Sequence, residues 1–220
     1  MTPLLDLWDR FQLKRTKRIV QPYTLVGPER IQSLFRLALR IERERVPGDV
    51  MECGVCNGGT AAVLARTATH SRMNRAVWLL DSFQGMPEVT ENDTATTQGD
   101  NPKEHVGKEV GSESRVREVL KLVGADMQRV RIVAGWFQDT LGSVTAEKIA
   151  LLNIDADWYG SVKICLETFY DRVVPGGFIS FDDYGHWPGC RKAVDEFIAG
   201  RRLPYKLQQV DYTARWFRKE

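Results

Sequence analysis

The sequence has few cysteines, no long apolar run and almost no excess of one charge over the other. Four Cys in 220 residues are too few for a disulfide scaffold, and no stretch approaches the roughly 18 apolar residues that cross a bilayer. Lys and Arg number 31 against 29 Asp and Glu, and a net charge of +2 gives no support for nucleic-acid or membrane-surface binding. The N-terminal residues include charges where a signal peptide has its apolar core. These absences favour a reduced, cytoplasmic protein without nucleic-acid or membrane partners.

The cysteine spacing gives little support for a zinc site. Cys53 and Cys56 form one C-x-x-C pair, but Cys165 and Cys190 stand alone. A four-thiolate zinc site needs two such pairs. We therefore interpret all four residues as ordinary packed thiols.

The composition is that of a globular domain, with 43% hydrophobic and 27% charged residues. Because a typical domain has about 150 residues, we expect residues 1–220 to form one domain. Residues 1–46 are predicted to form N-terminal helices. One helical pattern places Leu4, Trp8 and Phe11 on one face, and a second runs from Pro28 to Ile41. We interpret both as core-facing helices; the alternative for the first is a contact within a homo-oligomer, a dimer or larger.

From residue 49 onward, short apolar strands alternate with helices. The expected strands are residues 50–53, 76–81, 130–133, 149–154 and 178–181, and the expected helices are 60–69, 112–123, 162–170 and 191–198. This alternation predicts an α/β fold with a doubly wound, mostly parallel, Rossmann-like sheet. Two further strands, at 205–209 and 213–217, predict a C-terminal antiparallel hairpin.

One segment interrupts this alternation. Residues 87–114 are polar and contain almost no large apolar side chains. Loops of this length inside a domain are usually lids over a site or disordered segments. We interpret residues 88–114 as a mobile lid.

A glycine-rich turn follows the first expected strand. Its spacing, G-x-x-x-G-G from Gly54 to Gly59, differs from the G-x-G-x-x-G of a dinucleotide fold. Asp81 ends the next strand, where a carboxylate can accept hydrogen bonds from both hydroxyls of a ribose. Together they predict an adenosine-type site without a diphosphate.

Two pairs of acids follow two apolar strands. Asp155 and Asp157 come after one strand, and Asp182 and Asp183 come after another. Carboxylates clustered there would repel one another unless a cation joined them, and hard oxygen ligands suit Mg²⁺. If strand geometry persisted, Asp155 and Asp157 would lie on one face about 6.6 Å apart. Asp155 is nearer the strand and is assigned to the metal, and Asp157 to the substrate as a general base.

Five sequence blocks in this order resemble the macrocin O-methyltransferase family. They are VPGDVMECGVCNGGT, DSFQGMPE, GWFQDTL, NIDADWYGS and PGGFISFDDYG, and YTLVGPERI precedes them. The resemblance implies a class I methyltransferase sheet, a methyl donor that is S-adenosylmethionine, and a Mg²⁺-dependent transfer to the hydroxyl of a sugar. The chain departs from the family at Cys56-Asn57, where a Trp-Arg or similar pair is expected, so the acceptor end of the site is expected to differ.

The resemblance implies roles for individual residues. It matches Asp155, Asp182 and Asp183 with the metal ligands and Asp157 with the general base. The expected cofactor-binding residues are Glu52, Gly54, Gly58, Asp81, Ser82, Gly135, Trp136 and Phe137. His186 is the alternative base, and His70 and His105 are expected on the surface.

The preferred interpretation is therefore an S-adenosylmethionine-dependent O-methyltransferase that acts on a small-molecule hydroxyl, most simply a sugar of a glycosylated natural product. A catechol-type O-methyltransferase acting on an aromatic diol would use the same metal chemistry. The alternatives from different classes are an NAD-linked oxidoreductase, which the glycine spacing disfavours, and a non-catalytic nucleoside-binding domain, which the four clustered acids disfavour.

Overall fold

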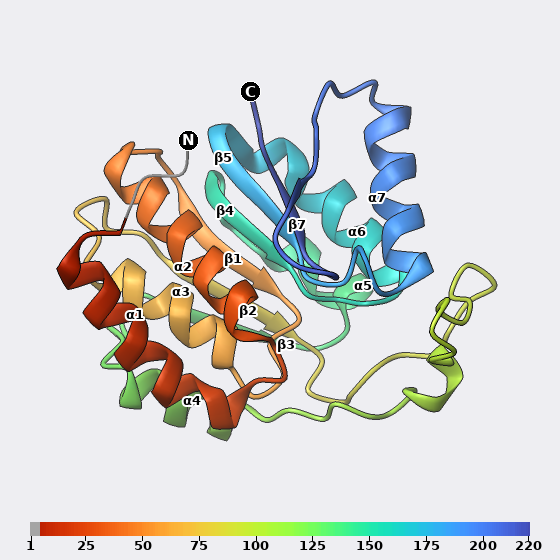
Figure 1. Ribbon diagram of the computed structural model, residues 1–220, viewed down its shortest axis with the longest axis horizontal. Coiled ribbons are helices and arrows are strands. Elements are labelled where there is room, and N and C mark those ends of the chain that lie inside the picture. Colours follow the sequence, from red (N-terminus) through yellow and green to blue (C-terminus); the bar gives the residue numbers. More distant parts are fainter. Residues whose placement is uncertain (1–4) are drawn as a thin grey trace.

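The strands form one mostly parallel sheet, seen in Figure 1. The computed structural model describes residues 5–220, and within them the strand order is β3-β2-β1-β4-β5-β7-β6. The strands are β1 (Asp49–Cys53), β2 (Val77–Asp81), β3 (Val130–Ala134), β4 (Ile149–Ile154), β5 (Val173–Phe181), β6 (Gln208–Gln209) and β7 (Arg215–Arg218). The first five are parallel, and β7 pairs antiparallel with both β5 and β6. The predicted α/β sheet and its C-terminal hairpin are confirmed.

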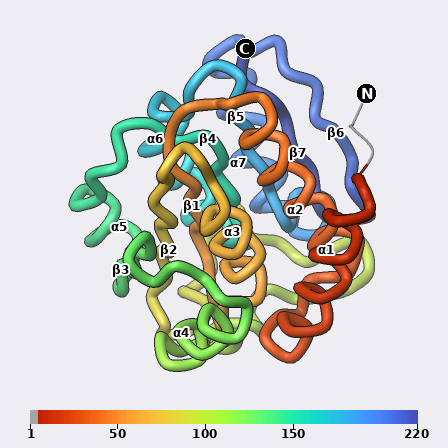
Figure 2. The backbone as a smooth tube through the Cα atoms, turned by 90° about the vertical axis from the view of Figure 1, so that its left-hand side faces the viewer, coloured from red at the N-terminus to blue at the C-terminus, as the bar shows by residue number. Residues whose placement is uncertain are grey.

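Helices cover both faces of the sheet, because its strands are apolar on both sides. One face carries α1 (Leu7–Val20), α2 (Pro28–Arg43), α3 (Gly59–Thr69) and α4 (Glu113–Leu122); the other carries α5 (Phe137–Thr140), α6 (Tyr159–Phe169) and α7 (Pro188–Gly200). Adjacent strand residues point into opposite layers, as Val50 and Met51 do. In Figure 2, α1 lies beside α2, α3 and α4, with α5 and α6 on the opposite side.

The predicted core-facing side of the first helix is wrong over the part that the structure describes. Trp8 and Phe11 are 67% and 57% exposed, and Leu4 lies outside the described residues. The inner side of the N-terminal half of α1 is polar instead: Asp9 pairs with Arg43 of α2. An ion pair between α1 and α2, which lie on the same face of the sheet, thus occupies the inner side of α1, and the apolar stripe faces outward, which periodicity alone did not indicate.

The segment before α4 is folded against the domain. Met86 forms an isolated bridge with Val106, and a short 3-10 helix, η2 (Pro102–Glu104), lies between them in sequence. In Figure 1 this yellow-green segment runs below the sheet and beside α7. Within residues 88–110 only Asp93, Thr96 and Pro102 are buried, so the segment buries little apolar area.

The five parallel strands end at the same edge of the sheet. β1 ends at Cys53, β2 at Asp81, β3 at Ala134, β4 at Ile154 and β5 at Phe181. β2 and β3 lie on one side of β1, whereas β4 and β5 lie on the other. The boundary between β1 and β4 is therefore the topological switch point, where open α/β sheets bind ligands. None of the helices within residues 5–220 is long and apolar enough to span a bilayer.

Candidate active site

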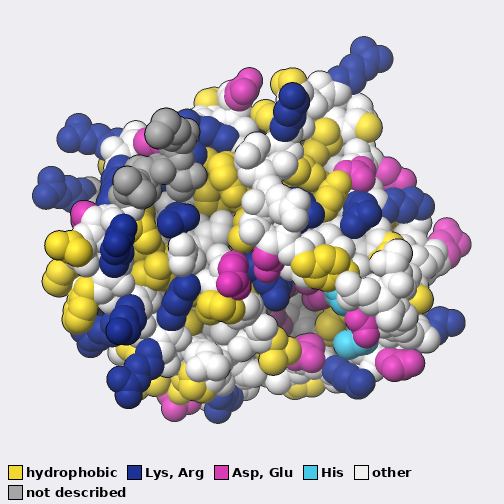
Figure 3. All heavy atoms as spheres, in the orientation of Figure 1, with side chains coloured by type: hydrophobic (Ala, Val, Ile, Leu, Met, Phe, Trp, Pro, Cys, Tyr) yellow, Lys and Arg dark blue, Asp and Glu magenta, His cyan; other side chains and the backbone are white. Residues whose placement is uncertain are grey.

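A cavity of about 700 Å³ opens at the carboxyl edge of the sheet. Its walls come from the turns after β1, β2, β3, β4 and β5, from the segment before α2, and from the segment before α4. Figure 3 shows a hollow right of centre with Asp, Glu and His side chains around it, whereas Lys and Arg gather on the left, over α1. The volume suits a drug-sized ligand or a cofactor.

The glycine turn after β1 brings two strand ends close together. Gly54 has φ +87°, and a Cβ there would lie 1.6 Å from the carbonyl oxygen of Asp155. Its N–H donates to the Leu80 carbonyl at 2.9 Å. Only glycine fits this position, because any side chain would collide with the end of β4. The turn therefore lies directly beside the end of β4, where the acid pair begins.

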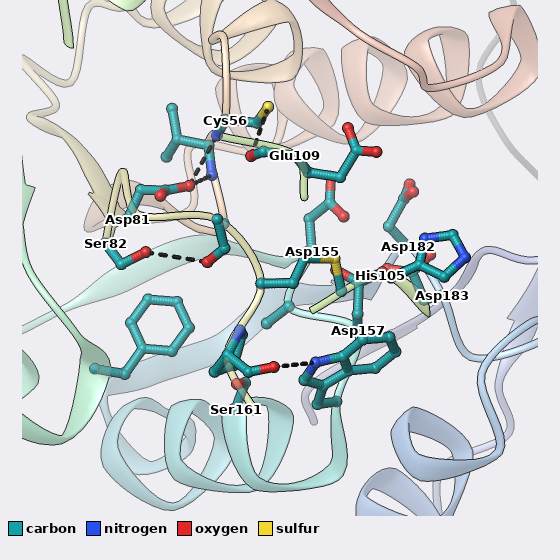
Figure 4. A pocket seen from close by; sticks show the side chains of 18 of the residues that line it. Cys56, Asp81, Ser82, His105, Glu109, Asp155, Asp157, Ser161, Asp182 and Asp183 are labelled. Atoms are coloured by element: carbon teal, nitrogen blue, oxygen red, sulfur yellow. Dashed lines mark hydrogen bonds between the residues drawn. The ribbon is translucent and has the colours of Figure 1, made fainter. Parts of the chain in front are cut away.

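Asp81, at the end of β2, accepts hydrogen bonds from the backbone of this turn. Its Oδ2 accepts from the backbone N–H groups of Val55 at 2.6 Å and Cys56 at 2.8 Å, and its Oδ1 accepts from Phe83 at 2.7 Å. Figure 4 shows the first two bonds beside the open cavity. A carboxylate has about four acceptor sites, and the backbone of this turn and of Phe83 uses three of them. Asp81 thus orders the turn, and about one acceptor site is left for the ribose bonds that the sequence predicts.

Five of the eight expected cofactor residues line the cavity: Gly54, Asp81, Ser82, Trp136 and Phe137. Glu52, Gly58 and Gly135 are not among its lining residues. Gly58 is instead the N-cap residue of α3, with φ +87°, and a Cβ there would lie 3.0 Å from the Cα of Val116 in α4. Sequence spacing could not distinguish a glycine that faces a ligand from one that lets two helices approach.

Glu52 is fully buried behind the glycine turn. Its Oε1 accepts from the Asn153 amide at 2.8 Å, and its Oε2 has no hydrogen-bond partner among the described residues. Burial raises the pKa of Glu52 to about 8, although the Asn153 hydrogen bond opposes the rise. At neutral pH this side chain is therefore mostly a neutral carboxylic acid, suited to support the turn rather than to bind a cation.

Three carboxylates converge at the ends of β4 and β5. One oxygen each from Asp155, Asp157 and Asp183 lies within 4.8 Å of the others. Strand geometry does not persist, since β4 ends at Ile154 and Asp157 has φ +53°. The left-handed backbone conformation of Asp157, and not the alternation of a strand, turns its side chain toward Asp155.

The pKa values of these acids reflect their enclosure. Burial raises the pKa of Asp157 to about 7, and the nearby Asp182 carboxylate adds to the rise. The Trp187 indole donates a hydrogen bond to Asp157 Oδ1 at 2.9 Å, which lowers the pKa. Burial also raises the pKa values of Asp155 and Asp183 well above their usual range, and the neighbouring carboxylates add to the rise. Several acids that share one pocket cannot all ionise at neutral pH without a compensating cation.

The fourth acid, Asp182, points toward the N-terminal helices. Its carboxylate pairs with the Arg30 guanidinium of α2. Burial raises the pKa of Asp182 to about 6, and the positive charge of Arg30 limits this rise. Asp182 and Asp183 therefore face different partners, as neighbouring residues at the end of a strand do.

The donor set fits a divalent cation of the Mg²⁺ type. All the converging atoms are carboxylate oxygens, the hard ligands that Mg²⁺ prefers, and no His or Cys is among them. The buried Oδ2 of Asp183 has no hydrogen-bond partner within residues 5–220. An orphaned, buried carboxylate oxygen beside two further carboxylates is an unfavourable arrangement that a bound cation would relieve.

The segment before α4 contributes wall residues that the sequence did not reveal. Asp93 Oδ1 accepts from the Tyr159 N–H, at the start of α6, at 2.7 Å, and Asp93 Oδ2 accepts from both N–H and hydroxyl of Thr90. Glu109 and His105 also line the cavity. His105, which we expected on the surface, is half-buried: its ring packs edge-on against Trp187, with 5.3 Å between the ring centroids.

His186, the alternative base, is not among the residues that line the cavity. Its Nε2 lies 3.5 Å from Asp100 and its ring packs against Trp187. Burial lowers its pKa, although Asp100 opposes the change. Asp157, which opens into the cavity, is geometrically the better candidate.

Comparison with known proteins identifies the family. The sequence pattern of the family described as macrocin-O-methyltransferase (TylF) matches residues 12–219. A mycinamicin III 3''-O-methyltransferase of Micromonospora griseorubida is 33% identical over 202 residues, which cover 90% of this chain and 78% of that protein. An 8-demethyl-8-(2,3-dimethoxy-alpha-L-rhamnosyl)-tetracenomycin-C 4'-O-methyltransferase of Streptomyces olivaceus is 32% identical over 197 residues, covering 89% of this chain and 75% of that protein.

A solved structure has the same architecture over nearly the whole chain. The O-methyltransferase NovP superposes with a TM-score of 0.83 at 25% sequence identity, and the match covers 96% of this chain and 99% of NovP. The cavity at the switch point and these relatives agree with the resemblance that the ordered sequence blocks gave. The chain belongs to the macrocin-O-methyltransferase family and is an S-adenosylmethionine-dependent O-methyltransferase.

Proposed function

We propose that this enzyme transfers the methyl group of S-adenosylmethionine to a sugar hydroxyl of a glycosylated natural product, with Mg²⁺ bound at the acid cluster. The observation that carries the proposal is the adjacency of two sites in one cavity, the Asp81-supported turn and the convergent carboxylates. The sugar O-methyltransferases among the relatives support the acceptor class. Asp155 and Asp183, two of the convergent carboxylates, would hold the cation together with Asp182, which pairs with Arg30 in this structure. Asp157, the third convergent carboxylate, is left for the acceptor.

The proposed chemistry is an in-line displacement in which the cavity aligns donor and acceptor. A bound divalent cation would lower the pKa of an acceptor hydroxyl that lay against it. Asp157 takes the hydroxyl proton as general base, and its hydrogen bond from Trp187 fixes the carboxylate in place. Without a metal, burial raises the pKa of Asp157 to about 7, and a neighbouring cation would lower it again, so that the carboxylate is ionised and can accept the proton.

Calorimetry tests the proposal directly. We expect S-adenosylhomocysteine to bind with and without Mg²⁺, and NAD not to bind, because the turn lacks the dinucleotide spacing. Methylation assays that offer a glycoside and, separately, a catechol then test the acceptor class. Preference for NAD would overturn the proposed cofactor, and turnover of the catechol alone would overturn the proposed acceptor.

Asp81→Asn is expected to weaken S-adenosylhomocysteine binding about tenfold or more, because charge-assisted hydrogen bonds contribute roughly 1.5–3 kcal/mol each. The amide keeps the shape of the side chain beside Val55 and Cys56. Isothermal titration measures the affinity. Asp139→Asn, on α5 and outside the cavity lining, is the matched control and is expected to bind like wild type. Wild-type affinity in a folded Asp81→Asn protein would contradict the ribose role.

We also propose that residues 88–114 act as a lid that is mobile without ligand and closes when cofactor and acceptor bind. Limited proteolysis is expected to cut this segment first, with ligands protecting it. Asp93→Ala should speed the cutting severalfold, because it removes the bond to the start of α6. Asn92→Ala, which loses only an exposed contact with Lys192, serves as control. First cleavage elsewhere, or no protection by ligands, would count against the lid.

The outward stripe of α1 supports a homo-oligomer. Leu7, Trp8 and Phe11 are each more than half exposed, and an apolar helix face of this kind marks interaction surfaces. We propose that two copies meet through it. Light scattering should give a dimer or larger for wild type and smaller particles for Trp8→Ser, whereas Leu122→Ser, on α4, should leave the size unchanged. A wild-type monomer would refute this.

A further inference from the structure

Arg30 connects three segments that are distant in sequence. It lies in the first turn of α2, its guanidinium pairs with Asp182 after β5, and its Nε lies 3.3 Å from Oδ2 of Asp211, before β7. The side chains of Arg30 and Asp182 are only 18% and 10% exposed. The Arg30–Asp182 pair is therefore well shielded from water, whereas the side chain of Asp211 is 24% exposed.

The position of this arginine is not explained by the stability of its helix. The first turn of a helix favours acidic side chains, because the backbone N–H groups give it a partial positive charge. A cation there is mildly unfavourable unless tertiary contacts compensate. The compensation must come from the carboxylates that Arg30 faces.

Arg30 is also the single Lys or Arg among the cavity-lining residues of the described chain. The acids Asp155, Asp157, Asp182 and Asp183 lie on the same wall. Burial alone would lower the pKa of the Arg30 guanidinium, but the surrounding carboxylates, Asp182 first, raise it instead. Four carboxyl groups thus share this cavity with one guanidinium, so the site holds more acids than one arginine can balance.

We propose that Arg30 is a positioning residue that acts as an internal counter-cation: it pairs with Asp182 while no metal is bound and releases it when a divalent cation takes that carboxylate. This inference rests on the metal site of the proposed function. It makes α2 part of the metal site, because Arg30 supplies the positive charge that balances the acids when no metal is bound.

The expected effect follows from charge compensation. Removing one partner of a buried ion pair leaves a carboxylate uncompensated and is strongly destabilising. A cation that binds only the folded protein offsets this loss in proportion to its affinity. Without Arg30, the site is more negative and Asp182 has no competing partner, so Mg²⁺ should bind more tightly and stabilise the protein more.

The test compares Arg30→Met with Arg43→Met in thermal unfolding and in Mg²⁺ calorimetry. Arg43 lies on the same helix and pairs with Asp9 of α1, on the side away from the cavity. We expect both variants to unfold at lower temperature in chelator. Mg²⁺ should raise the melting temperature of Arg30→Met at least twice as much as that of wild type, with about tenfold tighter binding, a coupling of usual size. Arg43→Met should respond to Mg²⁺ as wild type does.

Two further measurements separate the outcomes. Arg30→Lys retains a cation and should keep the wild-type response to Mg²⁺, and it gives the comparison if Arg30→Met does not fold. Equal Mg²⁺ responses in wild type and Arg30→Met, weaker binding by Arg30→Met, or an enhanced response in Arg30→Lys would overturn the inference. If wild type binds S-adenosylhomocysteine but shows no response to Mg²⁺, the metal of the proposed function fails, and the inference with it.

Discussion

Replacing Asp157 with Asn should lower kcat by about 10²–10⁴-fold, the usual cost of removing a general base. The amide fills the same volume and can keep the contact with the Trp187 indole through its oxygen. It cannot accept the proton of the acceptor hydroxyl, so chemistry slows while binding persists. Steady-state kinetics with saturating cofactor and Mg²⁺ measures the change, and part of the rate should return as the pH rises and hydroxide replaces the base.

Asp155→Asn is the informative comparison for this variant. Asp155 directly follows β4, and we expect its substitution to raise the Mg²⁺ concentration that gives half-maximal rate. S-adenosylhomocysteine affinity should stay near wild type in both proteins, which reports on folding. Loss of Mg²⁺ binding in Asp157→Asn but not in Asp155→Asn would reverse the two roles. Full activity of Asp157→Asn would place the base elsewhere.

Chelation should abolish methyl transfer, and the metal-free protein should lose thermal stability as the pH rises. The folded-state pKa is about 7 for Asp157 and about 6 for Asp182, and burial raises both. An unfolded carboxyl titrates near pH 4. Because the folded values are higher, the stabilisation is fully present below about pH 4 and is lost as the pH rises through about 6 to 7.

The magnitude is large because several groups act together. Between its unfolded-state and folded-state pKa values, such a carboxyl group is protonated in the folded protein and ionised in the unfolded chain. Over that pH range each group lowers the free energy of unfolding by about 1.4 kcal/mol per pH unit. Mg²⁺ binds the ionised carboxylates, so the rise in melting temperature on adding Mg²⁺ should grow from pH 5 to pH 8. Calorimetric unfolding scans in chelator and in Mg²⁺ measure it.

Two controls accompany the pH series. Asp183→Asn removes one of the three convergent carboxylates and should shrink both the pH trend and the Mg²⁺ effect. Asp171→Asn, which loses an exposed pair with Arg201, should leave the Mg²⁺ effect unchanged. Full activity in excess chelator, or a metal-free protein that gains stability toward pH 8, would contradict the metal assignment.

Local patterns in the sequence were sufficient to predict the architecture. Alternating apolar strands and helices specify a doubly wound sheet because strands buried on both faces must be apolar throughout, as β4 is. The same reasoning located the acids, since residues just after parallel strands gather at one edge. The glycine turn and Asp81 were predicted as neighbours for this reason, and the structure joins them by two hydrogen bonds.

Only the tertiary structure decided which acids converge and which one pairs with an arginine. Asp182 and Asp183 are adjacent in sequence, yet one pairs with Arg30 of α2 and the other joins Asp155. Arg30 lies 152 positions before Asp182, so no local spacing links them. The exposed stripe of α1 likewise depends on an ion pair between helices. Sequence periodicity determines which side chains share a face, but long-range packing determines what that face meets.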